Sequence, residues 1–212
     1  MTDVKEQVID RELIKDAYNY DEYRQMTDDL LKQGKTTGEN HSDAMIHYTK
    51  MNVHRMKRHD KRTELNEEIT ERVQNLDRQW IWLVITEAWC GDAAQSVPII
   101  AKMAELTNNI HLKFILRDEH LDVMDQFLYQ GKSRSIPKLV CLDAETLDVL
   151  GEWGPRPQKA QELYDTLRGS SEMAYQEVAE HLHKWYADDK GEEIQKEFLR
   201  AIDEWQSGIT HK

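Results

Sequence analysis

The run from Trp80 to Thr86 constrains the fold of this chain more than any other stretch. Its seven residues are apolar or β-prone without interruption, which is typical of a strand that is buried on both faces of a sheet. A strand of this kind requires other strands at its edges and helices over both of its faces. The run therefore predicts a strand that is buried on both faces of a sheet in an α/β fold.

The residues that follow alternate between helical and strand patterns. Apolar residues recur with helical spacing in three segments, and three further segments are short and β-prone. The expected helices cover residues 93–107, 121–129 and 158–168, and the expected strands cover residues 110–116, 138–142 and 147–151. This order of elements predicts a mixed sheet flanked by helices.

Both ends of the chain have helical patterns. Amphipathic segments precede the first strand, and the tail from Ser171 onward has two apolar stripes on either side of a polar turn at 188–191. We therefore expect three parts. They are an N-terminal helical extension (1–78), a domain that contains the sheet (79–168) and a C-terminal helical hairpin (169–212). The apolar stripes of the hairpin also suggest a homodimer.

The composition narrows the classes of partner and the location. The chain has 212 residues and a net charge of −12, which disfavours nucleic acid, because binding to phosphates depends on Lys and Arg. The sequence contains no apolar run of membrane-spanning length, and residues 1–12 do not resemble a signal peptide. We expect a cytoplasmic protein without a membrane partner. Its two cysteines, Cys90 and Cys141, are too few for a disulfide framework, and Cys141 is expected to be a small buried residue in a strand.

Cys90 lies between the first strand and the next helix, in the sequence Trp89-Cys90-Gly91-Asp92-Ala93. The partial positive charge of a helix N-terminus favours the thiolate, whereas the nearby carboxylate of Asp92 opposes it. Ala93 occupies the position at which a second cysteine would close a local disulfide. We expect a single, modestly activated thiol whose second sulfur comes from another molecule.

A basic segment and the histidines are the other candidates for a binding site. Residues 50–62 contain six Lys or Arg and one acid, Asp60, so this segment is either a solvated helix face or a site for an anion such as a glutathione carboxylate. Arg134 and Arg156 are weaker candidates for the same role. The histidine spacings place no two rings on one helical face, so no metal site is expected.

The order of elements, with Trp89-Cys90-Gly91 after the first strand, resembles the thioredoxin family. Pro98 lies eight residues after Cys90, where thioredoxins have the proline that kinks the active-site helix. Ile136-Pro137 precedes a strand and resembles the cis-proline loop that faces the thiol. The chain is also similar to a group of bacterial thioredoxin-family proteins with an N-terminal helical extension, and segments 48–52, 55–58 and 151–157 carry this likeness.

The resemblance implies a thioredoxin-like fold and thiol–disulfide exchange or glutathione-linked redox activity, with Cys90 as the catalytic nucleophile. The implied substrate-docking residues are Trp89, Gly91, Asp92, Ile136 and Pro137. The implied partner is a protein or small-molecule thiol or disulfide; glutathione is a co-substrate, and no cofactor is bound. Two departures leave open a non-catalytic binding or interaction module: Ala93 replaces the second cysteine, and Val84 stands where thioredoxins keep a buried acid. Glu87, three positions later, is assigned no role.

Overall fold

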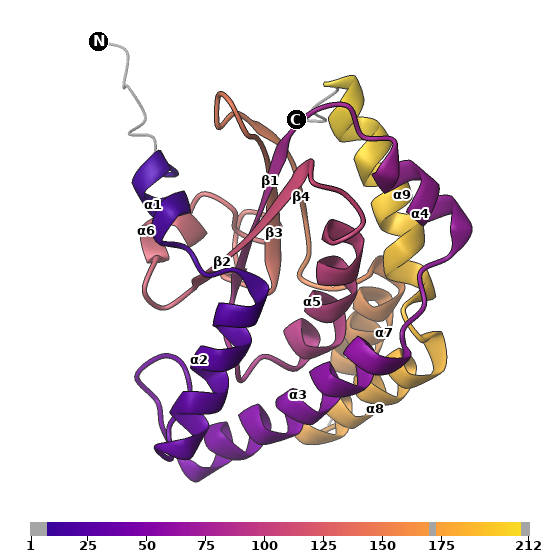
Figure 1. Ribbon diagram of the computed structural model, residues 1–212. Coiled ribbons are helices and arrows are strands. Elements are labelled where there is room, and N and C mark those ends of the chain that lie inside the picture. Colours follow the sequence, from indigo (N-terminus) through magenta and orange to yellow (C-terminus); the bar gives the residue numbers. More distant parts are fainter. Residues whose placement is uncertain (1–7, 170–172, 209–212) are drawn as a thin grey trace.

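A four-stranded mixed sheet forms the centre of the computed structural model, which describes residues 8–169 and 173–208 (Figure 1). Its strands, in spatial order, are β2 (Ile110–Leu116), β1 (Trp80–Thr86), β3 (Lys138–Asp143) and β4 (Val149–Trp153). β1 is parallel to β2 and antiparallel to β3, and β3 is antiparallel to β4. All seven residues of β1 are buried. The predicted α/β fold with a mixed sheet is therefore confirmed, and its first strand is buried as expected.

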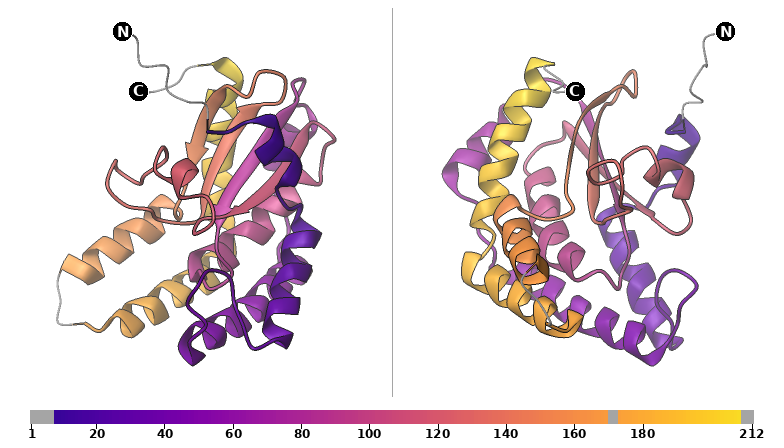
Figure 2. Two further views of the ribbon diagram at one scale, coloured as in Figure 1. Left: turned by 90° about the vertical axis from the view of Figure 1, so that its left-hand side faces the viewer. Right: turned by 180° about the vertical axis from the view of Figure 1, so that it is seen from behind.

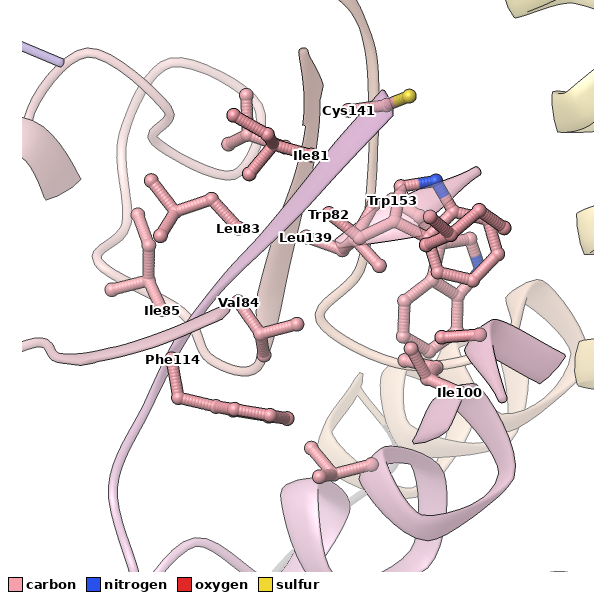
Figure 3. Packing of buried hydrophobic residues seen from close by; sticks show 14 of the residues in the cluster. Ile81, Trp82, Leu83, Val84, Ile85, Ile100, Phe114, Leu139, Cys141 and Trp153 are labelled. Atoms are coloured by element: carbon pink, nitrogen blue, oxygen red, sulfur yellow. The ribbon is translucent and has the colours of Figure 1, made fainter. Parts of the chain in front are cut away.

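Helices cover both faces of this sheet. Side chains of β1 alternate between the faces, so that Ile81, Leu83 and Ile85 point one way and Trp82 and Val84 point the other (Figure 3). α5 (Gly91–Ala104) and α9 (Glu192–Ser207) lie on the second side, while the short helices α1 (Arg11–Asp16) and α6 (Leu121–Met124) lie on the first (Figure 1). This arrangement places the N-terminus of α5 at one end of the sheet.

The N-terminal helices α2 (Tyr20–Lys32), α3 (Asp43–Arg62) and α4 (Glu67–Gln74) are attached to the sheet domain by specific contacts. Tyr18 and Phe114 of β2 exchange two backbone hydrogen bonds, of 3.0 and 2.8 Å, and Tyr23 stacks on Phe114 with ring centroids 5.2 Å apart. The amide of Asn52 in α3 donates to the carbonyl oxygen of Ala88 at 2.9 Å. α3 therefore reaches the turn that carries Cys90.

The two tail helices, α8 (Tyr175–Asp189) and α9, have different partners. α8 packs against α7 (Gln158–Gly169), whereas α9 packs against β4 and α4 (Figure 2). A tight turn at Lys190 and Gly191 joins the two tail helices, and each apolar stripe is buried against another part of the chain. Ser171, the expected start of the tail, lies outside the described residues.

Aromatic side chains attach α9 to the sheet. Phe198 lies 5.3 Å from Trp82 and 5.4 Å from Trp153, measured between ring centroids. The indole of Trp205 fits against Gly151, where a Cβ atom would collide with it. The apolar stripe of α9 is thus part of the main core and is not free to form a dimer interface. The homodimer that was inferred from the apolar stripes stays a prediction.

Several element boundaries differ from the sequence-based expectation, three of them near the candidate site or in turns. α6 ends at Met124, and the chain then forms turns instead of continuing as a helix to residue 129. β4 begins at Val149, because Leu147 adopts a positive φ of 64° in the preceding turn. α5 begins at Gly91, two residues earlier than expected, which makes Cys90 its N-cap. Among the described helices, none is long and apolar enough to cross a membrane.

Candidate active site

Cys90 lies where α5 meets the loop before β3. Its backbone carbonyl accepts from the N–H of Ala94 at 3.2 Å, so that Cys90 caps the helix. Its Sγ donates to the carbonyl oxygen of Ile136 at 3.3 Å, and the Ile136–Pro137 peptide bond is cis. The structure thus brings together two candidate segments that are 46 residues apart in the sequence.

The electrostatic environment holds Cys90 as a neutral thiol. Burial, followed by the carboxylate of Asp92, raises the pKa of Cys90 to about 12, although the backbone N–H groups of Ala93 and Asp92 and the guanidinium of Arg156 act in the opposite direction. Only 8% of Cys90 is exposed. The expectation of a modestly activated thiol is wrong for this arrangement, because desolvation outweighs the favourable helix N-terminus.

Helix α8 covers this thiol. A cavity of about 100 Å³ lies over Cys90, and α8 contributes Val178, Leu182 and His183 to its wall. The ring of His183 is so close to Gly91 that a Cβ atom there would lie 2.9 Å from Cε1 and 3.1 Å from Nε2. Gly91 was expected to contact a substrate, but in this structure it faces α8.

Asp92 connects three elements. Its Oδ2 accepts from Nε and Nη2 of Arg156, at 3.1 and 2.7 Å, and its Oδ1 accepts from the hydroxyl of Tyr186 in α8 at 2.7 Å. The guanidinium of Arg156 also lies over the ring of Tyr164 in α7, 4.4 Å from its centroid. Asp92 therefore binds the charged side chain of Arg156 and the neutral hydroxyl of Tyr186. Its hydrogen bond with Tyr186 holds α8 over the site.

Gln95 of α5 provides a second link to α8. Its Oε1 accepts from Nη2 of Arg58 at 3.3 Å and contacts Nε2 of His59 at 2.7 Å, and its Nε2 lies 3.1 Å from Nδ1 of His183. Because Arg58 can only donate, Gln95 donates through Nε2, and His183 accepts at Nδ1. Burial and the positive charge of Arg55 lower the pKa of His183 to about 4, so this link is a hydrogen bond between neutral side chains.

Side chains around the turn before Cys90 hold it in place. The carboxylate of Glu87 is fully buried and accepts from the N–H of Asp118 at 2.9 Å, and burial raises the pKa of Glu87. The hydroxyl of Thr37 accepts from the N–H of Ala88 at 2.9 Å. The indole of Trp89 lies under the guanidinium of Arg117, 4.9 Å from its Cζ. These contacts fix the turn from three directions.

The remaining candidates from the sequence lie away from this site. Arg134 is paired with the exposed Asp125 at 2.6 Å. Cys141 is a fully buried free cysteine in β3, opposite Trp82 of β1. Within residues 8–169 and 173–208, no group of three His, Cys, Asp or Glu side chains is placed to hold a metal ion.

Comparisons with known proteins bear on family and fold. A family model described as thioredoxin matches residues 38–168. The crystal structure of a protein of unknown function from Pseudomonas aeruginosa is 23% identical, with a TM-score of 0.53, and the match covers 88% of this chain and 98% of that chain. An HIV epitope scaffold is 21% identical, with a TM-score of 0.50, and the match covers 83% and 96% of the two chains. A search of curated proteins gave no match.

Proposed function

The chain belongs to the thioredoxin family, and from this premise we propose that it performs thiol–disulfide exchange through the single thiol of Cys90, at a site that α8 opens and closes. The observation that carries the proposal is the position of Cys90. Its sulfur lies at the N-terminus of α5 and against the carbonyl oxygen of Ile136. A thiolate formed there is stabilised by backbone N–H groups.

The proposed reaction has two steps, both of them exchanges. The Cys90 thiolate attacks one sulfur of a disulfide, a Cys90–sulfur bond forms, the original S–S bond breaks, and the released thiolate takes up a proton. The thiolate of a thiol of the glutathione class then attacks the substrate sulfur of the mixed disulfide, a new disulfide forms between these two sulfurs, the bond to Cys90 breaks, and Cys90 is released in its reduced form. The second thiol must come from outside, because Ala93 has no sulfur and Cys141 is fully buried in the sheet.

Helix α8 has to move before such a substrate can reach Cys90. The cavity of about 100 Å³ is too small for a disulfide with peptide-sized substituents. The apolar contacts of α8 support a movement of this kind, because Leu182 and Tyr186 form a small cluster with Ala160 of α7 that is separate from the main core. Opening would also remove most of the burial that raises the pKa of Cys90, so one motion would both expose and activate the thiol.

Incubation with oxidised glutathione tests the reaction directly. We expect intact-protein mass spectrometry to show one glutathione adduct on the wild-type chain and none on a Cys90→Ser variant. A Cys141→Ser variant is the matched control and should form the adduct as the wild type does, because Cys141 is inaccessible. An adduct that survives in Cys90→Ser, or its absence from the wild type after prolonged incubation at about pH 9, would refute the proposal.

A non-catalytic binding module is the second candidate. The specific observation in its favour is the covered thiol, which has a pKa of about 12 and therefore almost no thiolate at neutral pH. In that case Cys90→Ser should leave the binding of a partner protein unchanged, and the wild type should form no adduct with glutathione. The adduct experiment therefore separates the two candidates.

Removal of the Tyr186 hydroxyl should loosen α8. A hydrogen bond to a charged group is worth about 1.5–3 kcal/mol, and the contact between Tyr186 and Asp92 is of this kind. We expect Tyr186→Phe to raise the rate at which iodoacetamide alkylates Cys90 by about tenfold or more. Tyr129→Phe, which lies outside α8, should leave the rate unchanged. An unaltered rate in a folded Tyr186→Phe variant would show that α8 is not held over the thiol by this contact.

A further inference from the structure

We propose that a pocket between α3 and α8 binds a phosphate-type oxyanion, a property that goes beyond the proposed exchange reaction. The pocket has a volume of about 270 Å³, and three cationic side chains and no carboxylate contribute to its wall. The cations are Arg58 and Arg62 of α3 and Lys190, the C-cap of α8. It lies beside the thiol site, since Tyr186 contributes to its wall and donates to Asp92.

The three cations have no acidic partner in the described part of the chain. None of them lies within 4.0 Å of a described carboxylate. Two nearby acids are engaged elsewhere. Asp60 contacts Arg24 at 2.6 Å, and the carboxylate of Asp189 accepts from the N–H groups of Gly191 and Glu193. No described carboxylate therefore compensates the positive charge of the pocket.

The negatively polarised helix ends at the pocket offset only part of its positive charge. α3 ends at Arg62 and α8 ends at Asp189, and the C-terminus of a helix carries about half a negative charge. Two such ends offset about one of the three cations. An excess of about two positive charges remains in a chain whose net charge is −12, which matches the charge of a phosphate dianion.

The floor of the pocket is neutral and ordered. Burial lowers the pKa of His59, and the two ring nitrogens of His59 are occupied by Thr63 at 2.8 Å and Gln95 at 2.7 Å. Arg58 is held by Gln95 through one nitrogen, Nη2, and a guanidinium has five N–H donors. The remaining donors of Arg58 can bind an oxyanion without a large rearrangement.

Calorimetric titration with inorganic phosphate tests the site without any thiol chemistry. Ionic strength is kept constant with sodium chloride, and the proteins are the wild type, the double variant Arg58→Gln/Arg62→Gln and the control Lys35→Gln/Lys50→Gln. The control removes the same charge from exposed lysines outside the pocket. We expect saturable binding to the wild type and the control, and binding that is at least about tenfold weaker in the pocket variant, because two charge-assisted contacts are lost.

A second titration uses glycerol phosphate, a phosphomonoester. Tighter binding of the ester than of inorganic phosphate would identify the phosphate group of a larger molecule as the ligand, and the reverse order would identify free phosphate. The proposal is overturned if the wild type shows no saturable binding of either compound, or if the pocket variant and the control bind equally well. Neither result depends on whether Cys90 reacts, so failure of the exchange reaction would not count against the proposed phosphate site.

Discussion

Replacement of Gly151 by alanine should lower the free energy of unfolding by about 3–5 kcal/mol, the cost of removing a large aromatic side chain from a core. A Cβ atom at residue 151 would collide with the indole of Trp205. That indole is buried and rigid, and its ring lies 6.1 Å from Trp80 and 6.2 Å from Trp82. Trp205 must therefore leave its place, and α9 loses its anchor on the sheet.

Chemical denaturation in urea, followed by fluorescence or circular dichroism, measures this change. Gly169→Ala is the matched control, because it introduces the same methyl group at a position where, apart from its chain neighbours and the backbone of its own helix, no described atom lies within 4 Å. This control should change the free energy of unfolding by less than about 1 kcal/mol. A similarly small effect of Gly151→Ala would mean that Trp205 does not pack against the sheet in solution.

The central strands were predictable because their patterns are local. The apolar run at residues 80–86 and the segment 110–116 became β1 and β2 with the expected boundaries. The partners of α8 and α9 were not predictable, because an apolar stripe shows that one face of a helix is buried but does not identify what covers it. The two stripes suggested a homodimer, yet they pack within the chain, against α7 and against the sheet and α4.

At the candidate site, too, local features were predictable from the sequence and contacts between distant residues were not. The sequence pattern indicated the position of Cys90 at the start of a helix, and the resemblance to the thioredoxin family implied the proximity of Ile136. The contacts of α8 were missed, since Tyr186 is 94 residues from Asp92 and His183 is 88 residues from Gln95. These distant contacts decide the state of the thiol. The local sequence predicted a modestly activated thiol, whereas the burial that α8 completes raises the pKa of Cys90.

The rate at which iodoacetamide alkylates Cys90 at pH 7.5 should be about three orders of magnitude below that of a free cysteine. Only the thiolate reacts, and burial raises the pKa of Cys90 to about 12, compared with about 8.5 for a free thiol. Because the pKa is raised, the thiolate fraction is very small at neutral pH and increases about tenfold for each pH unit. The rate should therefore continue to rise up to about pH 11, without levelling off near 8.5.

The same protein unfolded in urea is the internal control, and its Cys90 should react with the ordinary profile, which levels off above pH 9. Movement of α8 does not remove the difference between the pH profiles of the folded and the unfolded protein. If the thiol ionises mainly in an open form, rising pH draws more molecules into that form, so the rate of the folded protein still increases by about tenfold for each pH unit. A plateau near pH 8.5 in the folded protein would thus show that Cys90 is solvated most of the time, and that α8 does not cover it in solution.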